Sequence, residues 1–464
     1  MQHTTEMDPN LRTLAATLDG RLVLPGDADW DTARMPWNLA VDQQPAAVAI
    51  PAASADDLRR IIAAARIGGF EIAVQPGGHG ASSDLRGCIL VRLANFDEVT
   101  VNVDERYARI GAGVKWGAVL ARLAGTGLIA LAGTNPDVTA AGYLLSGGHS
   151  WFSRWKGLAA HSIRAVEFVD AHGRSRRISA DSSAGGDAEL LWALRGAAGM
   201  LGMVTALEID LYPAPALFGG KILFPIEAAA IVLDTVAAIM AEAPDELTIF
   251  MGLVNMPDAP MVPEPMRGHS FATVDVVFVG DAATAGGLLA PLLSAAPVIA
   301  NLTQPFDIGH LGEVAAEPTD PMGSLDWNAA VTALGEDGFA PLIEAFAPAT
   351  PAGLSMVQLR PLGGAIADAA ADATGVVGHL DAQYLVFAGA ILMDPSRRID
   401  REAVFGPIDR AFSEMTIPRM VPTLLSPGQD LSAALSPEVL TRLGKVKFAV
   451  DPDSLFRSNR RLPS

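Results

Sequence analysis

The stretch "AVQPGGHGASSD", residues 73–84, places three glycines, a proline and one histidine directly after an apolar run. Glycine tolerates positive φ angles and lets the backbone approach a ligand closely, so we predict a tight polar turn here. A structural turn needs only its glycines. His79 is therefore either an incidental loop histidine or the reason for the turn.

The composition narrows the class of protein. Half of the 464 residues are hydrophobic and 18% are charged, which predicts a folded chain with a large core. The formal charge of −19 argues against nucleic acid and against an anionic membrane surface as partners. Cys88 is the single cysteine, which excludes an internal disulfide and a clustered-cysteine metal site, and we expect no metal. With no recognisable leader and no long apolar window, we expect a cytoplasmic protein.

The flanking sequence predicts alternating elements up to residue 213. Ser54 with Asp57 three residues on is typical of a capping box, and Gly68–Gly69 ends the helix that follows. We expect a second helix from Trp116. Strands are predicted at 70–74, 88–92, 98–103 and 203–213, with a hairpin at 165–179 whose turn lies at 171–173.

The pattern changes after "PAPA", residues 213–216. Strand-like runs cover 247–254, 270–279, 354–362 and 383–392, and helix-like runs cover 281–295 and 397–415. Because strands and helices do not alternate as in a parallel sheet, we expect an antiparallel sheet with helices on one face. The predicted fold class is α+β.

Glycine is dense at 77–80 and again at 142–148, "GYLLSGG". Successive backbone N–H groups in such turns can bind a pyrophosphate, although ordinary tight turns have the same composition. "GAGVKWG", residues 111–117, lacks the GxGxxG spacing of a nicotinamide-binding fold, and no Walker loop is present.

Five blocks together resemble the berberine-bridge-enzyme-like branch of the FAD-linked oxidases, with the vanillyl-alcohol-oxidase or PCMH-type fold. They are "IAVQPGGHG", "GAGVKWGAV", "SGGHSWFSRWKGLAAHSIRAVEFVDAHG", "AELLWALRGAAGMLGMVTALEIDLYP" and the C-terminal "DPDSLFRSNRRLP". The resemblance implies a PCMH-type FAD-binding domain of residues 1–214 and 416–464, and a substrate-binding cap of residues 215–415.

The resemblance also implies how FAD is held. The family joins the histidine of this turn to the 8-methyl carbon of FAD, which implies that role for His79. Asn135 stands where the family has a second tether, a cysteine, so we expect one bond only. Val138 falls where the family gates oxygen access. Cofactor contacts are expected from Gln75, Pro76, Gly77, Gly78, His79, Gly80, Gly133, Asn135, Asp137, Val138, Thr139, Gly142, Tyr143, Gly147, Gly148, Val204 and Asn459.

The family's chemistry is hydride transfer from a substrate C–H bond to flavin N5, assisted by a base. The family's usual tyrosine motif is absent. Tyr384, on a predicted cap strand, is our preferred base, with its pKa lowered by a neighbouring Arg360. The other candidates for catalysis are His149, Tyr143, Gln358 and Arg360. Each has a structural alternative, such as strand packing, a solvated strand face or filling of an aromatic's space.

We therefore expect an FAD-dependent oxidase of a small organic molecule, such as a secondary metabolite, with O2 as electron acceptor. Two alternatives stay open because the base is not obvious. One is a flavoprotein that binds and sequesters a small molecule. The other is a flavin-dependent oxygenase or oxidative cyclase of natural-product biosynthesis.

Overall fold

A computed structural model describes residues 8–182, 185–197, 199–260, 262–335, 337–394 and 399–463. The first sheet has the strand order β1 (Arg21–Val23), β2 (Ala47–Ile50), β4 (Cys88–Val91), β3 (Glu71–Val74) and β21 (Phe456–Arg457). All neighbours are parallel except the antiparallel pair of β1 and β2. The expected strands at 70–74 and 88–92 are confirmed.

Helix α3 (Ala55–Gly68) covers this sheet together with α1 (Pro9–Thr17), and α2 (Trp30–Arg34) lies beside β2. The Ser54 hydroxyl accepts hydrogen bonds from the N–H groups of Asp56 and Asp57, and Gly69 ends the helix at a φ of 69°. The predicted start and end of this helix are confirmed. Leu58, Ile61 and Ile62 are buried on its inner face.

The second sheet is antiparallel and has the order β5 (Val99–Asn102), β6 (Tyr107–Gly111), β10 (Met203–Asp210), β8 (Ile163–Val169) and β9 (Ser175–Ser179). The expected hairpin of β8 and β9 is confirmed. The single strand expected over 203–213 is interrupted at Leu211, and β11 (Tyr212–Pro213) pairs with β7 (Leu128–Ile129) instead. The helices of this part are α4 (Trp116–Leu123), α5 (Ala140–Leu144), α6 (Ser153–Lys156) and α7 (Asp187–Leu194).

The third and largest sheet is antiparallel, as predicted. Its order is β15 (Ala300–Asn301), β12 (Leu217–Pro225), β14 (Ser270–Val279), β13 (Leu247–Asn255), β18 (Met356–Pro361), β19 (Tyr384–Leu392), β17 (Gly323–Val331) and β20 (Thr416–Ile417), and β16 (Gln304–Phe306) also pairs with β12. The sequence analysis missed β12 and β17, and the short strands at the sheet edges.

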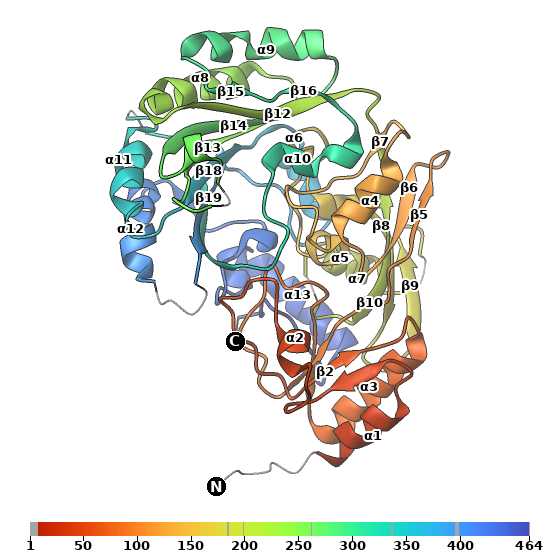
Figure 1. The fold of residues 1–464 in the computed structure, drawn as a ribbon. Helices are drawn as coiled ribbons and strands as arrows, with labels where there is room; N and C mark the ends of the chain where they lie inside the picture. The colour runs from red at the N-terminus through yellow and green to blue at the C-terminus, as the bar shows by residue number, and fades with distance from the viewer. Residues whose placement is uncertain are drawn as a thin grey trace.

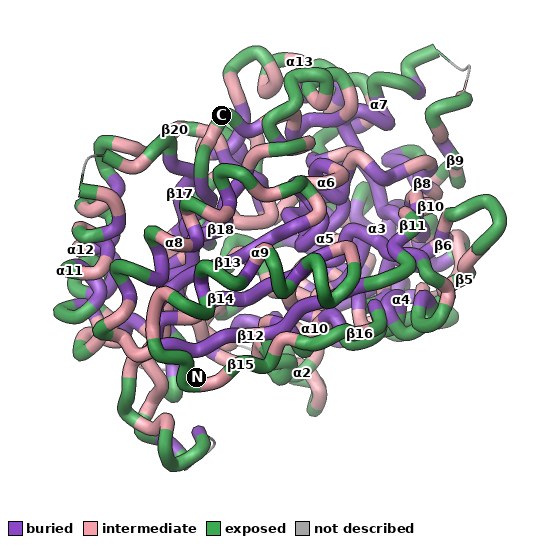
Figure 2. The backbone as a smooth tube through the Cα atoms, turned by 90° about the horizontal axis from the view of Figure 1, so that it is seen from above, coloured by how far each residue is buried: buried purple, intermediate pink, exposed green. Residues whose placement is uncertain are grey.

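Four helices cover one face of this large sheet: α8 (Ala229–Glu242), α9 (Ala282–Ala295), α11 (Ala340–Ala349) and α12 (Arg401–Phe412) (Figure 1). The prediction of helices on one face is confirmed, although only α9 and α12 were expected. The helix expected over 397–415 begins outside the described residues. Figure 2 shows β13 and β14 deeply buried while α9 exposes its outer side.

The C-terminal segment returns to the first sheet. Helix α13 (Pro437–Val450) leads into strand β21, which pairs in parallel with β3 and places Phe456 opposite Ile72. A short helix, α10 (Gly312–Ala315), lies earlier in the chain. Asp451 fixes this return, since its carboxylate accepts hydrogen bonds from the N–H groups of Leu455 and Phe456 at 2.9 Å. The domain limits at 214 and 416 stay a prediction. Within the described ranges, no helix combines the length and the apolar character needed to cross a membrane.

Candidate functional site

A cavity of about 430 Å³ lies between the glycine turns and the uncovered face of the large sheet. Its walls on one side are residues 74–80, 133–135, 138–139, 141–143 and 145–146. The strands β17, β18 and β19 form the other side, and Ser458, Asn459 and Arg460 follow β21 into it. The glycine turns and the strands that follow residue 216, which lie far apart in the sequence, therefore line one cavity.

The turn at 75–80 is held rigidly at its base. Gln75 is buried and exchanges an amide hydrogen bond of 2.9 Å with Gln43, and its carbonyl accepts from Arg92 at 2.9 Å. Gly78 has a φ of 98°, and an added Cβ would lie 2.9 Å from the side chain of Pro36. A residue with a side chain would be strained and would clash at this position.

His79 presents an unpartnered imidazole to the cavity. Its ring stacks on Trp37 with centroids 4.3 Å apart, and Trp37 donates a hydrogen bond to the carbonyl of Thr319. His79 Nε2 is buried without a hydrogen-bond partner within the described residues. Burial lowers the pKa of His79 to about 4, so the ring is neutral near pH 7.

Asn135 lines the cavity and uses both ends of its amide. Its Nδ2 donates to the carbonyl of Pro318 at 2.9 Å, and its Oδ1 accepts from the N–H of Asp137 at 2.8 Å. The residue has no thiol. It instead fastens the 317–319 segment to the glycine-turn side of the cavity.

Tyr143 is clamped between two glycines. A Cβ on Gly133 would lie 2.9 Å from the Tyr143 ring, and one on Gly148 would lie 2.5 Å from it. The ring meets Trp116 edge-on, with centroids 5.6 Å apart. Its hydroxyl is buried without a partner, and burial raises its pKa, so the phenol stays protonated.

Three expected cofactor contacts do not line the cavity: Asp137, Gly147 and Gly148. Asp137 is ion-paired with Lys115. Gly147 and Gly148 have φ angles of 98° and 69° and shape the turn that seats Tyr143. These three residues therefore lie outside the cavity lining, and their contact with a cofactor stays a prediction. The other expected cofactor contacts all line it: Gln75, Pro76, Gly77, Gly78, His79, Gly80, Gly133, Asn135, Val138, Thr139, Gly142, Tyr143, Val204 and Asn459.

On the sheet side, Gln358 and Arg360 of β18 both reach the cavity. Arg360 Nε donates to Gln358 Oε1 at 2.8 Å, and Gln358 Nε2 lies 3.4 Å from the buried carboxylate of Asp275. Asp275 is ion-paired with Lys221. A hydrogen-bonded line thus runs along the inner face of the sheet.

His149 lines the cavity but is only 4% exposed, with its ring centroid 5.7 Å from that of Phe250. Burial, helped by the charge of Arg360, lowers its pKa to about 3. A neutral imidazole with so low a pKa is a weak base. The expected place of His149 in the wall is found, but its chemistry favours packing.

Tyr384 is on the wrong face of the sheet. Side chains alternate along a strand, and Phe387, Gly389 and Ile391 of β19 line the cavity. Tyr384 is 3% exposed and packs edge-on against Phe339 under the helices. Its strand does neighbour β18, but burial raises the pKa of Tyr384 to about 12. The expectation of Tyr384 as a cavity base is wrong.

The sequence analysis missed a carboxylate on β17. Asp326 lines the cavity, and its Oδ2 accepts hydrogen bonds from Asn328 Nδ2 at 2.8 Å and Ser426 Oγ at 3.3 Å. Burial raises the pKa of Asp326. The alternating "DWN" within an otherwise apolar run is the signal that could have identified this strand face.

The cavity has the chemistry that a flavin nucleotide requires. Polar atoms without partners belong to several of its lining residues: His79, Tyr143, His149, Asn328 and Arg460. Buried polar atoms are ordinarily hydrogen-bonded, so these atoms indicate a polar ligand. Glycines leave backbone open on the same side, and Arg460 adds a cation. These residues fit FAD.

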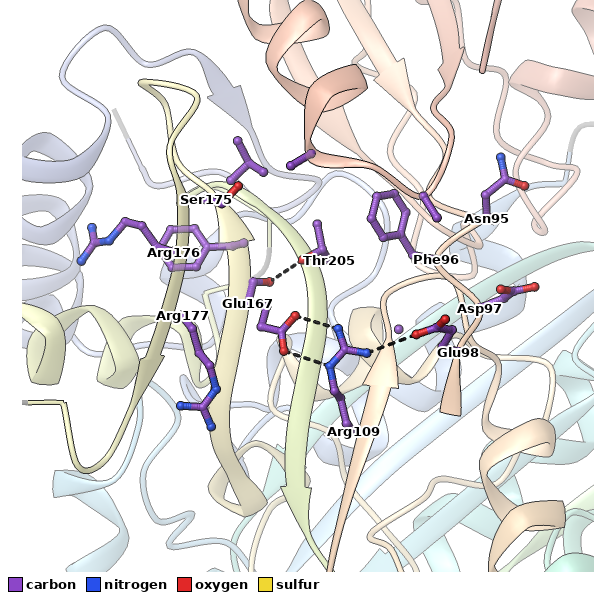
Figure 3. A pocket seen from close by; sticks show the side chains of 15 residues that line it. Asn95, Phe96, Asp97, Glu98, Arg109, Glu167, Ser175, Arg176, Arg177 and Thr205 are labelled. Atoms are coloured by element: carbon purple, nitrogen blue, oxygen red, sulfur yellow. Dashed lines mark hydrogen bonds and ion pairs between the residues drawn. The ribbon is translucent and has the colours of Figure 1, made fainter. Parts of the chain in front are cut away.

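A second hollow, of about 560 Å³, lies over the second sheet (Figure 3). Arg109 holds Glu167 through two hydrogen bonds of 2.9 and 2.7 Å, and Glu98 lies 3.7 Å from the Arg109 guanidinium. Arg176 and Arg177 are ion-paired with Asp187 and Glu208. Its lining includes none of the unpartnered buried atoms. The hollow therefore gives no sign of a ligand.

Comparison with known proteins finds a family match within the N-terminal part of the chain. Residues 45–179 match the family described as FAD binding domain. The match covers less than a third of the chain and concerns that part alone. The matched residues include the His79 turn, Asn135 and Tyr143.

Two curated relatives match part of the chain. An FAD-dependent monooxygenase of Fusarium proliferatum is 33% identical over 44% of this chain and 40% of its own length. The (R)-6-hydroxynicotine oxidase of Paenarthrobacter nicotinovorans is 32% identical over 43% of each chain. These matches span less than half of each relative.

The solved structure of a berberine-bridge-enzyme-like protein from Physcomitrella patens matches 98% of this chain and 99% of its own, with a TM-score of 0.82 at 19% identity. At this identity the likeness concerns the fold. The predicted PCMH-type fold around the FAD-binding domain is confirmed.

Proposed function

We propose that this protein is an FAD-dependent oxidase of a small organic molecule. The observation that carries the proposal is that the unpartnered His79 and the polar face of the large sheet line one cavity. One side can hold the cofactor and the other can hold a substrate against it. The curated relatives named oxidase and monooxygenase support this class of chemistry.

FAD would be held by the 75–80 turn, by Arg460 and by a single covalent bond to His79. The neutral imidazole has a free nitrogen lone pair, which such a bond requires, and Trp37 fixes the ring plane. Asn135 offers no second attachment. When bound, FAD supplies a two-electron acceptor for a substrate hydride.

Asp326 is the residue that would accept the substrate proton. It is a cavity-lining carboxylate, and a raised pKa makes a carboxylate a better proton acceptor near neutral pH. Asn328 and Ser426 fix its Oδ2. Tyr143 keeps its own proton and therefore cannot accept another, because burial raises its pKa. His149 is a weak base, because burial lowers its pKa to about 3.

O2 is proposed as the electron acceptor. Val138 lines the cavity with a modest side chain, which leaves room beside the cofactor.

The test of the covalent bond is to purify the protein, precipitate it with acid and follow the yellow colour. We expect the colour in the pellet for the native protein and in the supernatant for His79→Ala.

The same preparation is then mixed anaerobically with candidate alcohols, phenols and amines, and hydrogen peroxide is measured after air is admitted. Bleaching of the flavin followed by peroxide release supports the oxidase. Flavin freely extractable from the native protein contradicts the covalent bond. Tight binding of a ligand with no bleaching by any compound contradicts the oxidase and favours sequestration.

A further inference from the structure

The side chains along the inner face of the large sheet form an ordered line of partners that ends at the cavity. Asp275 lies opposite Lys221 on one neighbouring strand and opposite Phe250 on the other. The Asp275 carboxylate is ion-paired with Lys221 and accepts from Gln358, and Gln358 accepts from Arg360. Each member of the line is therefore satisfied by the previous one, up to Arg360.

Arg360 ends this line with its charge unpaired. Its only hydrogen bond among the described residues goes from Nε to the neutral amide of Gln358, and no described carboxylate oxygen lies within the 4.0 Å of an ion pair. The one acidic side chain near enough to act on it from the cavity wall is Glu317, at longer range. Asp275 is already occupied by Lys221.

A buried cation without a partner is costly. Arg360 is 7% exposed, and burial lowers its pKa. A guanidinium nevertheless stays protonated in proteins. Phe250 lies under the guanidinium at 4.7 Å from the ring centroid, and Gln358 holds Nε, so the plane of the group is fixed. The terminal nitrogens remain as donors for a ligand in the cavity.

Resting on the proposed function, we infer that the substrate is an organic anion, a carboxylate or phenolate, whose oxygen atoms pair with Arg360. A guanidinium donates two parallel hydrogen bonds to a carboxylate, and such pairs are about twice as strong as neutral hydrogen bonds. Asp326 lies on β17, separated from β18 by β19, so the anionic end of the substrate and the site of proton removal are separate. This separation orients the molecule.

The test uses the flavin-containing protein with benzoate and benzamide as probes, which have similar shape and differ in charge. Binding is followed by the change in flavin absorbance and by calorimetry. We expect benzoate to bind at least tenfold more tightly than benzamide. Arg360→Met should bring the two affinities within about twofold of each other, and Arg360→Lys should restore part of the preference. Arg164→Gln, which removes a cation outside the cavity, should leave the preference unchanged.

Equal affinity for the two probes in the native protein overturns the inference, and so does a preference that survives Arg360→Met. Failure of both probes to bind overturns it as well. Sulfite affinity of the flavin is measured in parallel. If Arg360→Met weakens sulfite binding and leaves the benzoate preference intact, the cation acts on the cofactor and the inference is wrong. Flavin content and acid-stable colour are measured on each sample, so failure of the proposed oxidase is recognised separately.

Discussion

Trp37 lies flat against His79, with ring centroids 4.3 Å apart and the ring planes inclined by only 16°. The indole is itself fixed through its hydrogen bond to Thr319 at 3.1 Å. A loop histidine in a glycine-rich turn would otherwise rotate freely. This stack orients the imidazole, as the proposed reaction at a single ring nitrogen requires.

Trp37→Leu should therefore slow the attachment of FAD without abolishing it. Orientation of a reacting group is commonly worth 10-fold or more in rate. Apoprotein is mixed with FAD, samples are denatured at intervals, and flavin fluorescence of the protein band is measured. His79→Ala is the control that shows no bound flavin at any time. An unchanged rate for Trp37→Leu would show that the stack does not position the ring.

Asp326→Asn should slow anaerobic reduction of the flavin by substrate by about 100-fold or more, because removal of a general base commonly costs that much. The amide keeps the size of the side chain, so flavin content should not change. Tyr384→Phe is the matched control: its hydroxyl faces the helices, so its reduction rate should stay within about twofold of the native rate. The assignment of Asp326 as the base would be contradicted if Tyr384→Phe reduced the flavin slowly while Asp326→Asn reduced it at the native rate.

Gly148→Ala tests the clamp on Tyr143. An added methyl would approach the ring to 2.5 Å and would sit at a φ of 69°. Gly87→Ala also sits at a positive φ, 78°, but its methyl meets nothing within 4 Å. Both variants pay the backbone strain, and only Gly148→Ala adds overpacking, which commonly costs about 1–3 kcal/mol. Urea denaturation should show Gly148→Ala less stable by that margin.

Buried histidines predict a loss of stability in acid. The pKa of His149 is about 3 in the folded chain against 6.5 in the unfolded chain, so unfolding takes up a proton between these values. The contribution of the neutral, buried His149 to the free energy of unfolding is complete above pH 6.5 and is lost as the pH falls towards 3. At pH 5 the loss is about 2 kcal/mol. His149→Gln should flatten the fall of the unfolding free energy between pH 7 and 5, and an unchanged slope would contradict the shift.

How much of this could be read from the sequence depends on the element. Helix α3 has its cap, its apolar stripe and its terminal glycine in order, so its limits were predictable. Strand β12 was missed because its interior holds Gly219 and Gly220, which disfavour strands. Gly219 is needed there because a Cβ would lie 2.2 Å from the carbonyl of Val276.

The candidate site divides in the same way. The His79 turn was predictable, because glycine density and one histidine mark it. The face of Tyr384 was not, because "YLVFAGAIL" is apolar on both sides and shows no alternation; a shift of one residue exchanges the two faces. The sequence analysis missed Asp326 and Asn328 because polar residues inside β17 lower its strand propensity. These two side chains line the cavity, which accounts for polar residues in this strand. The cytoplasmic location stays a prediction.

Strand β21 lies late in the sequence but pairs with β3, which precedes the His79 turn, and this bears on when the cofactor can be captured. His79 leaves the ribosome early, but the strand beside its own sheet, and the Ser458, Asn459 and Arg460 wall, are translated almost four hundred residues later. The nascent chain therefore carries an incomplete pocket for nearly all of its translation. We therefore expect FAD to be captured only after the 456–460 segment has folded onto β3.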